Sequence, residues 1–158
     1  MNIAPRIEFL EDKKLVGVSL SMSLIENRTI DLWRSFMVRN KEIKNKANSE
    51  YISLQVYPKD YYQNFSPANK FVKWALVEVT DAHVVPDGME VFVLSKGKYA
   101  VFDYKGLPND ARIFTYIFQE WLPNSKYQLA NRPHFEVLGD KYKNNDPNSE
   151  EQIWIPIQ

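Results

Sequence analysis

The segment WLPNSKYQLANRPHFEV, residues 121–137, places one carboxylate, Glu136, inside an otherwise aromatic and apolar strand. A carboxylate held among rings is costly unless a cation, an arginine or hydrogen bonds offset its loss of water. The chemistry that suits such a group is therefore recognition of a cationic ligand. The alternative is an ordinary solvated residue on an exposed strand, because a glutamate is seldom fully buried without a partner.

Few other residues could act together with Glu136. His134 lies on the same side of the strand but about 7 Å away along it, which makes a direct acid–base pair awkward. Trp74 shares a strand face with Glu78, and Trp154 is predicted to lie on the same face as Glu136. If Phe135 and Val137 face the helices, Glu136 lies on the opposite face of the sheet.

Composition excludes several classes of site. The 158 residues contain 20 Lys plus Arg and 20 Asp plus Glu, and a balanced charge disfavours direct nucleic-acid binding. The absence of Cys and the presence of only two His argue against a metal centre, a disulfide framework or a serine-type triad. No GxGxxG phosphate loop is present, so no cofactor is predicted. Aromatic residues make up 14% of the chain, enough to fill a core and also to line a pocket for flat or cationic ligands.

The chain is predicted to be one cytoplasmic domain over residues 1–158. Its length fits a single core, its first residues lack the apolar stretch of a signal peptide, and no run approaches a membrane span.

The elements that must position Glu136 follow from periodicity. One helix is predicted to begin near Asn27 or Thr29 and to bury Trp33 and Phe36; a second follows GLPND and ends at Pro123. Strands are predicted by alternation over residues 7–10, 15–22, 51–57, 71–79, 89–94, 99–104, 135–138 and 153–157. Lys96-Gly97-Lys98 is predicted to be a hairpin tip, and Glu11-Asp12-Lys13 occupies a similar place.

The two halves of the chain resemble one another. Matching Lys14 to Lys98 gives an offset of about 84 residues, with repeats over about 5–80 and 87–158. We therefore predict an α+β fold of duplicated β-α-β-β units, in which two main helices pack on an antiparallel sheet. The interface between two such halves is a favoured position for a ligand cleft.

The C-terminal half carries a family pattern. GKYAVFDYKG, then EWLPNSKYQLANRPHFEV and finally EEQIWIPIQ resemble the GyrI-like small-molecule-binding family. This is the effector-binding domain of bacterial AraC- and MerR-type multidrug-responsive regulators, which also occurs alone. The first half agrees more loosely, through IDLWRSF and KWALVEV. The resemblance implies the duplicated fold and a central cleft for hydrophobic, often cationic, planar compounds.

The resemblance also implies particular ligand-binding residues. The pocket carboxylate of the family falls on Glu136, and its aromatic lining falls on Trp74 and Trp121, with Tyr51, Phe36 and Tyr104 as further candidates.

Two departures from the family pattern stand out. Ser125-Lys126-Tyr127 replaces the usual SGY. Gln152 stands where a second acid often precedes IWIPI, with Glu150 and Glu151 shifted away, which predicts a less negative pocket.

Three functions remain open from the sequence. The favoured one is a stand-alone protein that senses or sequesters hydrophobic, aromatic or cationic compounds, because no helix-turn-helix is recognisable. The second is a hydrolase of cyclopropane-containing DNA-alkylating compounds, in which Glu136 with a raised pKa acts as the catalytic group. The third is a protein-interaction module, with gyrase or a separate regulator as its partner.

Overall fold

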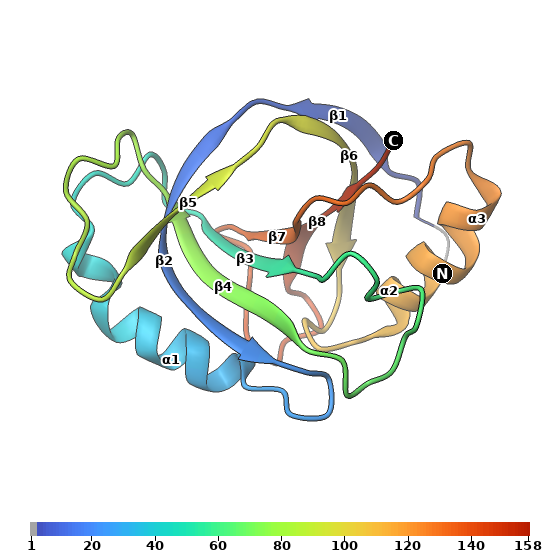
Figure 1. Ribbon diagram of the computed structural model, residues 1–158, viewed down its shortest axis with the longest axis horizontal. Coiled ribbons are helices and arrows are strands. Elements are labelled where there is room, and N and C mark those ends of the chain that lie inside the picture. The colour runs from blue at the N-terminus through green and yellow to red at the C-terminus, as the bar shows by residue number, and fades with distance from the viewer. Residues whose placement is uncertain (1–2) are drawn as a thin grey trace.

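The computed structural model describes residues 3–158, whose strands form one eight-stranded antiparallel sheet. The sheet curls on itself, with α1 outside one end and α2 and α3 outside the other (Figure 1). The strands are β1 Arg6–Leu10, β2 Lys13–Met22, β3 Tyr51–Val56, β4 Phe71–Glu78, β5 Glu90–Leu94, β6 Gly97–Lys105, β7 His134–Leu138 and β8 Glu150–Pro156. The helices are α1 Thr29–Arg39, the 3-10 turn η1 Asn40–Glu42, α2 Arg112–Tyr116, the π-helical turn η2 Ile117–Trp121 and α3 Leu122–Asn124.

The strand order is symmetric about its centre. It runs β1-β6-β8-β7-β3-β4-β2-β5, which reads the same in reverse when each strand of one half is exchanged for its counterpart in the other. The register has the same symmetry. Moving Arg6 forward and Val101 back by 84 residues converts the pair Arg6–Val101 into the pair Glu90–Gly17. The central pair is therefore β3–β7, which joins the two halves. That the halves arose by duplication stays a prediction.

The two predicted hairpin tips are wrong. β1 pairs with β6 and β2 pairs with β5, so neither β1–β2 nor β5–β6 folds back on itself. Tight two-residue hairpins require positive φ, and among the described residues positive φ occurs only at Gly88, Gly106 and Asn145. At both places the chain instead continues from one strand into a strand with a different partner. The β1–β2 connection meets the β5–β6 connection, where Lys96 N donates to Asp12 Oδ1 at 2.6 Å.

The two faces of the curled sheet have different partners. The inner face is closed by the sheet alone, because its apolar cluster draws on all eight strands and on no helix; the buried members are Leu10, Leu15, Ile52, Leu54, Leu76, Leu94, Tyr99, Val101, Phe135 and Trp154. The outer face carries two separate clusters. One packs against α1 through Leu32 and Phe36, and the other packs against α2 and η2 through Ile113 and Ile117.

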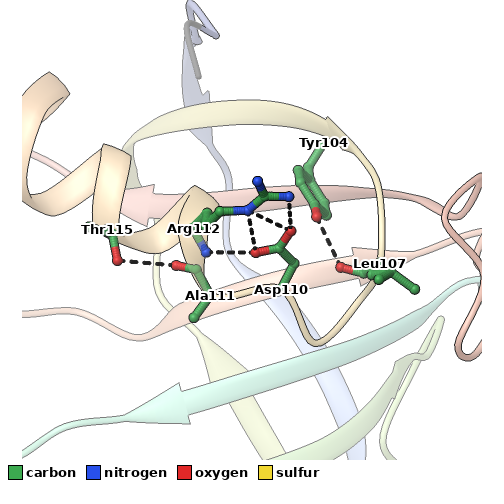
Figure 2. Close-up of polar contacts among 6 residues, drawn as sticks. All are labelled: Tyr104, Leu107, Asp110, Ala111, Arg112 and Thr115. Carbon is green, nitrogen blue, oxygen red and sulfur yellow. Dashed lines mark hydrogen bonds and ion pairs between the residues drawn. The ribbon is translucent and has the colours of Figure 1, made fainter.

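Both helices start with polar contacts near the predicted residues. Thr29 N donates to Asn27 Oδ1 at 3.0 Å where α1 begins. Arg112 N donates to Asp110 Oδ1 at 3.0 Å where α2 begins (Figure 2). The second helical stretch continues through Pro123 to Asn124 rather than ending at the proline. Because proline cannot donate to the carbonyl four residues earlier, the wider π turn of η2 accommodates it.

Candidate functional site

Glu136 lies on the outer face, at the centre of the sheet. It pairs with Ser53 of β3 and with Ile153 of β8, and Ser53 pairs in turn with Ala75 of β4. Ala75 belongs to the cluster under α1 and Ile153 to the cluster under α2, so Glu136 lies between the two helical layers. The condition considered from the sequence, that Phe135 and Val137 face the helices, is not met, because both lie inside the curled sheet; Glu136 is therefore on the side of the helices.

Two further ionisable groups share this face. Lys73 of β4 pairs with Gln55, which pairs with His134 of β7. Glu151 of β8 lies two residues before Ile153 and therefore points to the same side. Across the strand order β8-β7-β3-β4, the row runs from Glu151 through Glu136 to Lys73.

Burial perturbs all three groups. Glu136 is only partly exposed, and desolvation raises its pKa to about 7 against the opposing effects of Lys73 and of a Gln55 hydrogen bond. Desolvation raises the pKa of Glu151 to about 8, with a further upward contribution from Glu136. Desolvation lowers the pKa of Lys73, which the two acids oppose. Each charge is thus held where its charged form is disfavoured.

The three groups influence one another without direct ion pairs. Within residues 3–158, no ion pair of 4.0 Å or less joins Lys73 to Glu136 or Glu151. With its amide nitrogen turned toward β7, Gln55 donates to Glu136 Oε2 at 3.1 Å and to the His134 carbonyl at 3.2 Å. Glu136 therefore keeps acceptor capacity for a further donor or cation.

The second acid of the site is Glu151. Gln152 points to the inner face, where its Oε1 accepts a hydrogen bond from Trp154 Nε1 at 3.1 Å. Glu151 takes the outer face, where the nearby charge of Glu136 adds to the upward shift of its pKa. The prediction that the second carboxylate is shifted away from the site is therefore wrong, because the alternation of β8 places position 151 rather than 152 beside Glu136.

Aromatic rings lie beside Glu136 and join the two halves of the chain. Tyr57, which follows β3, has its ring 4.9 Å from His134, with centroids as the reference points. Tyr62, in the loop between β3 and β4, stacks on Phe118 of η2 at 5.5 Å and on His134 at 5.9 Å. Burial lowers the pKa of His134 to about 3, so this imidazole is neutral near pH 7 and acts as one of the rings.

Four of the predicted lining residues belong to the two outer-face clusters on either side of Glu136. Tyr51 and Phe36 lie on the α1 side, with ring centroids 6.4 Å apart. Trp121 lies on the α2 side, edge-on to Phe102 at 5.2 Å. Tyr104 lies on this side too, and its hydroxyl donates to the Leu107 carbonyl at 2.9 Å (Figure 2).

The other two tryptophans expected beside Glu136 are on the inner face. Trp74 is edge-on to Phe92 at 5.2 Å, and Trp154 stacks on Phe135 at 5.1 Å. For Trp154 the expectation fails by one position, because Ile153 and not Trp154 pairs with Glu136. Trp74 fails for the same reason: its neighbour Lys73 takes the outer face.

One of two cavities borders the row of charges. One of about 380 Å³ is lined by residues of the β6–β8–β7 end of the sheet, including Glu151 and Tyr104. The other, of about 250 Å³, lies against the loop between β3 and β4 and includes Pro58 and Tyr61. The Glu151 end of the row therefore borders a hollow, whereas the nearby rings gather around His134, two residues from Glu136.

Sequence reasoning missed Lys73, Gln55, Tyr62 and Phe118. The sequence did contain a signal for Lys73, because it is the one charged residue among the alternate positions Phe71, Lys73, Ala75 and Val77, which share a strand face. No such signal exists for Tyr62 and Phe118, which meet only through the folding of a loop onto a helix.

The described residues hold no group suited to a metal ion and no membrane span. Among residues 3–158, no cluster of three or more His, Cys, Asp or Glu side chains could coordinate a metal. The same part of the chain contains no helix both long enough and apolar enough to cross a bilayer.

Comparison with known proteins places this geometry in a family. Residues 6–157 match the family described as "Cass2: Integron-associated effector binding protein". The chain belongs to this family. It is also 31% identical to the transcriptional regulator BrlR of Pseudomonas aeruginosa over 128 residues, which are 80% of this chain and 45% of BrlR. The chain thus spans about half the length of this curated relative.

Solved structures share the fold at low sequence identity. The C-terminal domain of EcmrR superimposes with a TM-score of 0.75 at 13% identity, covering 100% of this chain and 99% of that one. SAV2435, solved bound to tetraphenylphosphonium, superimposes with a TM-score of 0.69 at 17% identity, covering 99% of this chain and 94% of that one. The curled α+β fold is therefore that of effector-binding domains, and the GyrI-like resemblance is confirmed.

Proposed function

We propose that this protein binds hydrophobic aromatic cations on the outer face of β3–β7, with Glu136 as the residue that recognises the positive charge. One observation carries the proposal: the Glu136 carboxylate is desolvated among rings and has only the amide of Gln55 as a hydrogen-bond donor among residues 3–158. Its ionised form is destabilised in the free protein, and a bound cation would remove that destabilisation.

The surroundings support a flat and apolar ligand. Tyr57, Tyr62 and Phe118 present ring faces and edges next to His134, and ring faces attract cations by about 0.5–2 kcal/mol each. Because Tyr62 belongs to a loop, its ring can move aside to admit a ligand more easily than a ring on a strand. Membership of an effector-binding family agrees with small-molecule recognition. The proposal includes that the ligand-bound state regulates another protein.

Calorimetric titration with tetraphenylphosphonium tests the proposal, since this cation is the one bound in the SAV2435 structure. Glu136→Gln keeps the shape of the side chain and the Gln55 contact but removes the charge, so we expect affinity to fall at least tenfold, as for loss of a buried charge pair. Glu26→Gln, at an exposed acid paired only with Lys70 at 3.5 Å, is the matched control. Equal affinity of Glu136→Gln and wild type would reject the assignment.

Hydrolysis is the outcome to separate from binding. A carboxyl whose pKa is about 7 is suited to general-base chemistry as well as to binding. Incubation with a cyclopropane-containing alkylating compound and mass spectrometry of the products distinguishes the two. Product that accumulates beyond one equivalent and disappears in Glu136→Gln would replace the binding proposal by an enzymatic one.

A further inference from the structure

Lys73 is a partly buried lysine within a site otherwise suited to cations. It lies on the outer face of β4, two strands from Glu136, and both acids of the row act on its pKa. Its Nζ has one recorded hydrogen bond within residues 3–158, to Thr29 Oγ1 at 3.2 Å. A lysine ammonium has three donors, so Lys73 retains capacity for a further acceptor.

The surroundings of Lys73 favour negative charge. Thr29 is the first residue of α1, an 11-residue helix, and the first turn of a helix carries unpaired N–H groups and the positive end of its dipole. The ammonium and the helix end therefore act in the same direction. The aligned charges of Glu151 and Glu136 act in the opposite direction at the other side of the row.

The site is consequently polarised along one line. From β8 to β4 the sheet is roughly 14 Å wide, which is three strand spacings, and the acids occupy β8 and β7 while the ammonium occupies β4. A ligand that carried only positive charge would satisfy one end and be repelled by the other. A ligand with a cation at one end and an acceptor at the other would complement both.

We propose that the site selects aromatic zwitterions, whose cationic group binds beside Glu136 and Glu151 and whose carboxylate or similar anionic group accepts hydrogen bonds from Lys73 Nζ. This inference rests on the proposed function, since it assumes that a cation binds at Glu136. It adds a second recognition element, and it makes Lys73 the residue that sets ligand charge specificity.

A pair of dyes that differ only in one charge tests the inference. Tetraethylrhodamine with a free carboxylate is a zwitterion at pH 8, and its ethyl ester carries the same ring cation without the anion. Affinities of both dyes are measured by fluorescence anisotropy for wild type, for Lys73→Met, which keeps the apolar stem, and for Lys14→Met, which removes an exposed lysine of β2.

Lys73→Met is expected to weaken binding of the free-carboxylate dye about tenfold, the effect of losing one charge-assisted hydrogen bond. Binding of the ester is expected to stay the same or to tighten several-fold, because a like charge is removed. Lys14→Met is expected to leave both affinities unchanged. A Lys73→Met protein that changes both affinities by the same factor would overturn the inference while leaving the proposed function intact.

Failure of the proposed function has a different signature. If neither dye binds wild-type protein, both the cation site and its zwitterion specificity are rejected. Lys73→Gln provides a second variant, with a polar side chain that cannot carry the charge, and thermal unfolding of each variant verifies that it is folded. The ratio of the two dye affinities must shift in the same direction in Lys73→Gln as in Lys73→Met, or the inference fails.

Discussion

The inner and outer faces of the curled sheet are built from alternate residues of the same strands, yet they differ in the kind of side chain they bury. Phe135 is 2% exposed and packs between Tyr99 and Trp154 at ring distances of 5.3 and 5.1 Å. Its neighbour Glu136 faces the other way, toward a row of charges and the rings of the β3–β4 loop and η2. The inner face is built around an apolar cluster that serves stability, with Gln152 hydrogen-bonded to Trp154 at its edge, whereas the centre of the outer face keeps charged groups at a free-energy cost. Such a cost at one place in an otherwise consistent fold is typical of a functional site.

The largest expected effect is on the inner face. Phe135→Ala is predicted to lower the free energy of unfolding by about 3–5 kcal/mol, because it removes a buried ring and leaves a cavity. Urea unfolding followed by tryptophan fluorescence measures the change. Phe9→Ala removes the same ring from a position that is 62% exposed, so it should change stability by less than about 1 kcal/mol. Equal effects at the two positions would mean that the inner face does not carry the stability.

The next effect has the opposite sign and belongs to Glu136. Its pKa is about 7 in the folded protein against the ordinary value of 4.5, so between these values the unfolded chain gives up a proton that the folded chain keeps. Raising the pH through this window therefore favours unfolding. Glu136→Gln removes the penalty and is predicted to stabilise the protein by about 3 kcal/mol at pH 8 and by almost nothing at pH 4.5.

Unfolding free energies of wild type and Glu136→Gln at pH 4.5, 6 and 8 measure this difference. Taking the difference between the two proteins removes the contribution of His134, whose folded pKa of about 3 makes the neutral form persist on acidification and acts in the opposite sense. A difference that does not grow with pH would show that the carboxyl is solvated and would erase the contrast between the two faces.

These two neighbours also show what sequence could and could not supply. Alternation predicted all eight strands, because a half-buried strand must repeat every two residues. Alternation identifies which residues share a face but not which face meets the helices. The face of Glu136 could therefore be stated from the sequence only under a condition, that Phe135 and Val137 face the helices, and the structure does not meet that condition.

Strand pairing was the other property beyond reach of local pattern. Lys96-Gly97-Lys98 has the composition of a turn, but in the structure Gly97 lies against the Arg132 guanidinium, where an added Cβ would come 2.4 Å from Cζ and the arginine would have to shift. The glycine at this position is thus explained by the close approach of Arg132, from the loop before β7, and not by a turn. The row of Glu151, Glu136 and Lys73 depends on pairings between strands distant in sequence, so the row could be drawn only once the sheet order was known.

A third prediction concerns the pH dependence of binding. If a cation binds the ionised form of Glu136, protonation competes with it, and affinity for tetraphenylphosphonium should rise about tenfold from pH 6 to pH 8 as the pH passes the carboxyl pKa of about 7. Calorimetry in two buffers of different ionisation enthalpy would also detect the released proton. Glu136→Gln should lose most of this slope, with the remainder due to Glu151, whose pKa is about 8. A slope equal to that of wild type would place the titrating group elsewhere.

The smallest expected effect is the contact between the two halves across the outer face. Tyr62 and Phe118 stack at 5.5 Å, one from the β3–β4 loop and one from η2, and Tyr62 is 39% exposed. A double-mutant cycle of Tyr62→Ala and Phe118→Ala is predicted to give a coupling energy of about 0.5–1.5 kcal/mol, the range for an aromatic pair beyond its buried area.

A matched cycle of Tyr62→Ala with Phe9→Ala, whose ring lies on the edge strand β1, should give no coupling, since additivity holds for sites without shared partners. Repeating the first cycle with saturating tetraphenylphosphonium extends the comparison to the bound state. If the Tyr62 ring must move aside for the ligand, its coupling to Phe118 falls on binding; if both rings clamp the ligand, the coupling rises. A coupling that binding leaves unchanged would mean that the loop only seals the outer face, as the strands seal the inner one, and takes no part in ligand entry.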